Sequence, residues 1–169
     1  MTQITRTDPP KIADERTSLT SWLDYERATL ALKCQGLPAD QLRERAVPPS
    51  TLSLLGLIRH MSEVERGWFV RTLKGEKAED IYCTDADPDG DFDGVDTAGV
   101  DEAFATWSAE CERARSLVAA APSFAVVGRK RDGEEISLRW ILVHMIEEYA
   151  RHNGHADLLR QRIDGAVGE

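Results

Sequence analysis

Four long stretches with helical periodicity dominate the sequence and constrain its fold more than any other feature. Within each stretch, apolar side chains recur at spacings of three, four and seven, which is the pattern of a helix with one buried face. The predicted helices cover residues 15–36, 50–74, 101–121 and 137–164. Their ends coincide with residues that stop helices, namely Gly36, Gly75, Pro122 and Gly165. Since no strand pattern of comparable length competes with them, we predict an all-α fold in which the four helices form a bundle.

Two connections between the predicted helices have distinctive sequences. Residues 76–99 form a long acidic loop, and we expect residues 84–99 to be exposed and mobile. Residues 85–96 imitate a calcium-binding EF-hand loop. An Asp stands where that loop needs a bidentate Glu, which favours a solvated loop and leaves weak calcium binding as the alternative. Residues 123–136 join a short β-favouring run to an Asp-Gly turn and predict a small hairpin before the last helix.

Composition narrows the class of protein. The chain has 169 residues, which suits a single domain at residues 14–169 preceded by a flexible arm at residues 1–13. Its net charge of −9 argues against nucleic-acid binding. No segment resembles a membrane span or a secretion signal, so no membrane partner is expected. Three cysteines without a CxxC motif suit a reducing compartment, which predicts a cytoplasmic location.

The cysteines and tryptophans are interpreted mainly as packing residues. Cys34 and Cys111 fall within apolar helical patterns and are expected to be buried, whereas Cys83 begins a loop and is expected to be a surface thiol. Core positions are predicted for all four tryptophans, Trp22, Trp68, Trp107 and Trp140.

The histidines point to chemistry because they gather on two of the predicted helices. His60 lies on the second helix, and His144, His152 and His155 share the fourth with Glu148. At 100° per residue, these four positions of the last helix fall within about 80° of arc, beside the apolar stripe. Glu148 and His152 are four residues apart, so their side chains lie one turn apart on one face. That spacing lets both residues bind one metal ion.

A third metal ligand has to come from another helix, and His60 sits where it could face the fourth. Neutral imidazole and carboxylate suit zinc, nickel, iron and manganese. Three protein ligands leave coordination positions for water or substrate, as in catalytic sites. His144 and His155 are expected to orient a ligand or move a proton rather than to bind the metal. The residues alone leave a plainer interpretation open, in which His60 is a packing residue and the Glu–His pair is a surface ion pair.

Two segments carry a family resemblance. LSLLGLIRHMSEVERGWFVRTL (52–73) resembles the second helix of the DinB-like superfamily of metalloenzymes, and SLRWILVHMIEEYARHNGHADLLRQRIDG (137–165) resembles its last conserved helix. The resemblance implies a DinB-like four-helix bundle that is often a homodimer. It also implies that His60, Glu148 and His152 are the metal ligands. Many members have His at the position of Glu148, and a Glu there resembles the branch that includes mycothiol-dependent maleylpyruvate isomerase.

The resemblance also implies an activity. Characterised members resemble thiol-dependent transferases or isomerases, in which a metal activates the sulfur of a low-molecular-weight thiol. We therefore expect a divalent-metal-dependent enzyme acting on a small-molecule substrate or thiol. Zinc is the favoured metal, and nickel, manganese and iron are the alternatives. The rival hypothesis is a non-enzymatic, dimeric helical bundle that binds a small molecule or a partner protein, with its metal structural or absent. Arg59 and Arg151 are candidates for meeting an acidic substrate.

Overall fold

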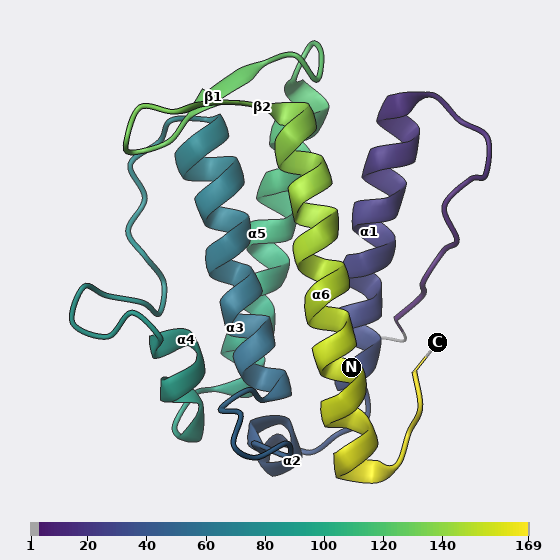
Figure 1. Cartoon of the computed structure of the whole chain (residues 1–169), viewed down its shortest axis with the longest axis vertical. Helices are drawn as coiled ribbons and strands as arrows, with labels where there is room; N and C mark the ends of the chain where they lie inside the picture. Colours follow the sequence, from purple (N-terminus) through teal and green to yellow (C-terminus); the bar gives the residue numbers. More distant parts are fainter. Residues whose placement is uncertain (1–3, 169) are drawn as a thin grey trace. The chain divides into compact units, whose positions relative to one another are not determined.

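The structure, a computed structural model, describes residues 4–168 and is mostly helical (Figure 1). The all-α prediction is confirmed, and the helix content is consistent with a DinB-like helical bundle. The chain divides into two compact units. The first unit comprises the described parts of Met1–Leu57 and Leu142–Glu169, and the second unit is Ile58–Ile141. Residues 1–3 of the predicted flexible arm lie outside the described residues, and the single domain at residues 14–169 stays a prediction.

The first unit contains α1 (Glu15–Cys34), α2 (Ala39–Arg43), the first residues of α3 (Leu54–Glu65) and most of α6 (Leu138–Asp164). Helix α1 begins where Asp14 accepts a hydrogen bond from the backbone N–H of Thr17 at 3.0 Å, which satisfies one of the open donors of the first turn. At its other end, Arg160 of α6 donates to the carbonyl oxygens of Lys33 and Gln35 at 2.9 and 2.8 Å. These bonds fasten the C-terminal turn of α1 to α6.

The second unit contains most of α3, the π-helical segment η1 (Arg66–Leu73), α4 (Gly90–Asp93), η2 (Gly94–Asp96), α5 (Val100–Ala120) and the hairpin β1 (Val127–Arg129) and β2 (Glu135–Ser137). The predicted hairpin is present, with Gly128 opposite Ile136 in an antiparallel pair. A Cβ atom on Gly128 would stand 2.4 Å from the carbonyl oxygen of Thr72, so the absence of a side chain lets β1 approach η1. The predicted helix at residues 50–74 is found as α3 followed directly by η1.

The acidic connection differs from its prediction in its second half. Residues 84–89 are exposed, as expected, but Gly90, Asp91, Val95 and Ala98 are buried. The prediction of an exposed loop over residues 84–99 is therefore wrong at these four positions, which lie in and just after the short helices α4 and η2. Val95 is fully buried, because a short helix lets one apolar side chain reach the core from an otherwise acidic segment.

Two of the tryptophans are not core residues. Trp22 is 46% exposed and Trp140 is 47% exposed, so the core prediction is wrong for both, whereas Trp107 is buried. Trp140 instead packs against Trp68 near the surface, with ring centroids 5.2 Å apart.

Among residues 4–168, no helix combines the length and the apolar composition needed to cross a membrane.

Candidate metal centre

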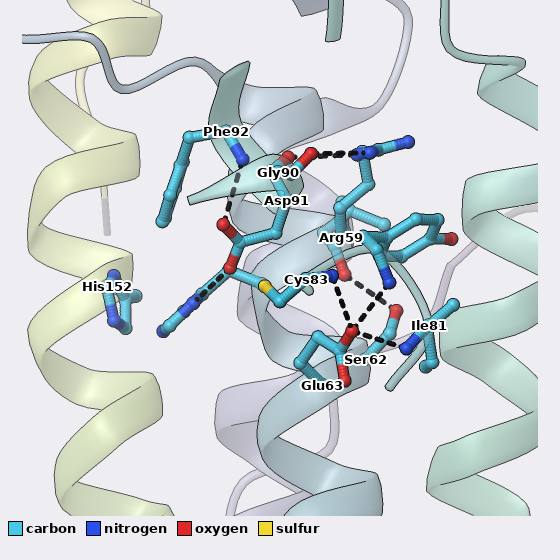
Figure 2. Close-up of polar contacts among 12 residues, drawn as sticks. Arg59, Ser62, Glu63, Ile81, Cys83, Gly90, Asp91, Phe92 and His152 are labelled. Atoms are coloured by element: carbon cyan, nitrogen blue, oxygen red, sulfur yellow. Dashed lines mark hydrogen bonds and ion pairs between the residues drawn. The ribbon is translucent and has the colours of Figure 1, made fainter. Parts of the chain in front are cut away.

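In the second unit, His60 of α3 is held by the turn that carries α4. Its Nδ1 atom lies 2.8 Å from Oδ2 of Asp91, whose other carboxylate oxygen accepts the backbone N–H of Phe92 at 2.9 Å (Figure 2). The Phe92 ring stacks on the imidazole with centroids 5.1 Å apart. Since an ionised carboxylate can only accept hydrogen bonds, His60 donates from Nδ1. The EF-hand alternative does not fit this arrangement, because position seven of such a loop, here Asp91, binds calcium through its backbone carbonyl oxygen, and Nε of Arg59 already donates to that oxygen at 2.9 Å.

Arg59 fastens the same turn from the neighbouring position of α3. Its Nε and Nη2 atoms donate to the carbonyl oxygens of Asp91 and Gly90 at 2.9 and 2.7 Å (Figure 2). The guanidinium also lies 3.8 Å from the centroid of the Tyr82 ring, a cation–π contact. Arg59, considered above for an acidic substrate, is thus buried and engaged with the protein's own backbone.

Glu63, one turn further along α3, holds the start of the acidic connection. Its Oε1 atom accepts backbone N–H groups from Ile81, Tyr82 and Cys83 at 2.5, 2.6 and 3.2 Å (Figure 2). A buried carboxylate is stabilised by such convergent donors. Arg59 and Glu63 therefore fix two points of the chain segment that brings Asp91 to His60.

In the first unit, Glu148 and His152 lie together on α6, one turn apart as the sequence predicted. The Oε2 atom of Glu148 is 3.6 Å from Nε2 of His152. The other carboxylate oxygen is 3.4 Å from Nε2 of His144, one turn earlier. Glu148 therefore stands between two imidazoles of its own helix.

His155 is the neighbour of His152, and their Nδ1 atoms are 3.4 Å apart. A hydrogen bond between these two atoms requires one to donate and the other to accept. The tautomer of His152 that keeps a lone pair on Nε2 carries its proton on Nδ1 and donates it to His155. In that state His155 accepts the Nδ1 proton of His152.

A second group on α6 could also hold a cation. The ligand atoms of His144, Glu147 and Glu148 all lie within 4.8 Å of one another. Glu147 is 47% exposed and also forms an ion pair with Arg151. This group is thus more open to solvent than the Glu148–His152 pair.

The side chains of His60, Glu148 and His152 are of the types that bind divalent ions. Two imidazoles and one carboxylate form a ligand combination found in catalytic zinc sites, which keep an open position for water or substrate. Glu148 is half-buried, with Nη1 of Arg151 3.9 Å from its Oε2, and a bound cation would further offset the free-energy cost of removing its carboxylate from water. The residues therefore fit a divalent metal.

The chain's own thiols are not poised for chemistry. Burial raises the pKa of Cys34 to about 12. Burial, followed by the charges of Asp91 and Glu63, raises the pKa of Cys83 to about 11. Cys111 is buried with its Sγ atom 3.6 Å from Oε1 of Glu65. The burial predicted for Cys34 and Cys111 is confirmed, whereas Cys83 is partly buried rather than a surface thiol.

A family model described as mycothiol-S-transferase matches residues 18–165. The chain belongs to the mycothiol-S-transferase family. This match covers both segments that carried the DinB-like resemblance and confirms it. Comparison with curated protein sequences gives no match.

Sequence reasoning missed Asp91 and the turn around it. Asp91 is one of six Asp residues between residues 85 and 96, and it lies 31 residues from the imidazole that it contacts. Nothing in its local spacing distinguishes it from its neighbours. The one available signal is the flanking pair Gly90 and Phe92, a small residue and an aromatic residue that interrupt the acidic run.

Proposed function

We propose that this protein is a divalent-metal-dependent enzyme of thiol-transfer or isomerase type, with the metal held by His60, Glu148 and His152. The observation that carries the proposal is the mycothiol-S-transferase match, which spans both helices that bear these ligands. The ligand chemistry supports it, because two imidazoles and a carboxylate suit zinc foremost and nickel, manganese or iron as alternatives.

A divalent cation in such a site supplies Lewis acidity, which lowers the pKa of a thiol or water molecule that it binds. The protein's residues then have separate tasks. His60 presents Nε2 while Asp91 holds its Nδ1 proton. Glu148 supplies a negative charge, and His144 contacts the carboxylate oxygen that faces away from His152. His155 can accept the Nδ1 proton of His152 and keep that ring in its metal-binding tautomer.

The reacting sulfur is proposed to come from a low-molecular-weight thiol rather than from a cysteine of the chain. The raised pKa values of Cys34 and Cys83 keep both thiols protonated near neutral pH, which makes them poor nucleophiles. We therefore propose mycothiol or a similar thiol as co-substrate and a small electrophile as substrate. A homodimer, as the resemblance implies, and a cytoplasmic location, as the cysteine pattern predicts, are part of the same proposal. Light scattering of the purified protein tests the dimer.

The test combines metal content with thiol turnover. The purified protein is stripped with a chelator, reloaded with zinc and assayed with mycothiol and the thiol-reactive dye monochlorobimane by fluorescence. We expect conjugation by the zinc-loaded protein, loss of turnover after stripping, and no turnover by Glu148→Ala. Zinc binding without thiol turnover would favour the non-enzymatic bundle with a structural metal. Failure to bind any divalent metal would reject the proposed site.

A further inference from the structure

The contact between His60 and Asp91 sets which imidazole nitrogen can bind a metal. In the neutral form a histidine carries one proton, and a proton on Nδ1 leaves the lone pair on Nε2. Asp91 accepts the Nδ1 proton at 2.8 Å, and its carboxylate is only 5% exposed. The hydrogen bond is therefore short, and its acceptor is shielded from water although the imidazole is 25% exposed; both the short distance and the buried acceptor strengthen it.

We infer that Asp91 is a positioning residue that fixes His60 in the tautomer with its lone pair on Nε2 and holds the ring in place. The inference rests on the proposed function, in which Nε2 of His60 binds the metal. A metal-binding histidine commonly donates its second N–H to a carboxylate, which fixes its tautomer and raises the basicity of the binding nitrogen. Asp91 never needs to touch the metal, because it acts through the ring of His60.

The turn around Asp91 is built to hold this one side chain. A Cβ atom on Gly90 would stand 2.4 Å from the carbonyl oxygen of Tyr82, so only glycine lets the two backbone segments approach so closely. Arg59 binds the carbonyl oxygens of Gly90 and Asp91 themselves. The Phe92 N–H occupies the second oxygen of Asp91. The backbone, the arginine and the neighbouring N–H thus leave the carboxylate little freedom to rotate.

The Phe92 N–H makes Asp91→Asn an informative variant. This N–H also donates to the carbonyl oxygen of Asp89 at 2.9 Å, and an amide NH2 beside it would set donor against donor. The orientation that places Oδ1 of the Asn where Oδ1 of Asp91 now lies is therefore favoured. The amide NH2 then faces His60 and donates to Nδ1. The imidazole proton is thereby driven to Nε2, the nitrogen that would otherwise carry the lone pair. The substitution is nearly isosteric, so it changes the direction of one hydrogen bond with little change of shape.

The experiment reads the tautomer directly in metal-free protein. Long-range ¹H–¹⁵N correlation spectra at about pH 8, where imidazoles are mostly neutral, report which nitrogen is protonated. His60→Gln assigns the signals. We expect the Nδ1–H form in the wild type and the Nε2–H form in Asp91→Asn. A wild-type spectrum in which His60 is mainly in the Nε2–H form would overturn the inference, whatever the result for Asp91→Asn.

Zinc titration by calorimetry provides the second readout. Asp91→Asn should weaken zinc binding by about 10–100-fold, the usual cost of losing such a partner. The matched control is Asp93→Asn, which removes the same charge from an exposed side chain two positions away. It should keep the wild-type tautomer and the wild-type zinc affinity. An unchanged tautomer and affinity in Asp91→Asn would overturn the inference. If His60→Gln binds zinc as tightly as the wild type, the proposed site fails, and the tautomer readout still decides the role of Asp91.

Discussion

The two parts of the candidate metal centre are held in different ways. In the second unit, His60 is fixed by a residue 31 positions away, whose own backbone is bound by Arg59. In the first unit, Glu148 and His152 have neighbours from their own helix, at contacts of 3.4 to 3.6 Å. The carboxylate that orients His60 is 5% exposed, whereas that of Glu148 is 17% exposed.

This difference indicates which part is preorganised. A 2.8 Å hydrogen bond to a buried carboxylate defines one geometry for His60 through the protein's own residues. Contacts beyond about 3.3 Å on a helix surface are weak and allow rotation about the side-chain bonds. We therefore expect His60 to be the fixed ligand and Glu148 to be the ligand that adjusts to the ion.

Removing a ligand from either part should have the largest effect. His60→Ala, Glu148→Ala and His152→Ala should each weaken zinc binding more than about 100-fold, because a lost ligand costs more than a lost orienting partner. His155→Ala should weaken binding less. Acidification below about pH 6 should weaken binding in the wild type, because a protonated imidazole cannot bind a metal. The measurement is calorimetric titration of metal-free protein. Wild-type affinity in His60→Ala would mean that α6 binds the ion alone.

The reactivity of Cys83 tests whether the turn beside His60 stays closed. The raised pKa of about 11 keeps this thiol protonated at neutral pH, and the thiolate is the reactive form. Alkylation by iodoacetamide at pH 8 should be on the order of 100-fold slower than for glutathione, and the rate should climb until about pH 11. Peptide mass spectrometry follows this residue separately, and urea-unfolded protein is the control. A rate at pH 8 equal to that of glutathione would show that the turn opens readily.

Loss of the Glu63 carboxylate should destabilise the acidic connection that packs against His60. Glu63→Ala leaves three backbone N–H groups without their acceptor, which should lower the free energy of unfolding by about 1–3 kcal/mol. Urea unfolding measures this change, and cleavage by protease at residues 84–89 should become faster. Glu79→Ala, which removes an exposed carboxylate from the same connection, serves as the control. Equal stability in the two variants would argue that Glu63 does not fasten the turn.

The smallest effect on zinc affinity is expected for His144 and Glu147, which lie beside Glu148 on α6. His144→Gln should reduce zinc affinity by less than about tenfold, because its 3.4 Å contact with Glu148 is long and partly exposed. Glu147→Gln should have no effect on the titration. A sharp loss of zinc binding in Glu147→Gln would instead assign the ion to the group of His144, Glu147 and Glu148.

The same contrast explains how much the sequence could predict. The Glu148–His152 pair was found because spacing along one helix determines which side chains share a face. The four long helices were placed within a few residues for the same reason. Asp91 could not be found, since its partner depends on how a connection of irregular structure returns to α3. The exposed positions of Trp22 and Trp140 were missed because helical periodicity places a residue beside the apolar face without showing whether another element covers it.

The π-helical turn at Arg66–Leu73 gives the two ligand-bearing helices different tolerance to length changes. A π-helical turn holds an extra residue relative to an α-helical one, so a one-residue deletion within η1 can be absorbed by conversion to α-helix. The residues of α3 before it, His60 included, would keep their register. A deletion between Glu148 and His152 in α6 would instead rotate one residue about 100° away from the other. Homologous chains that retain the site can therefore vary in length at η1 but not between these two positions.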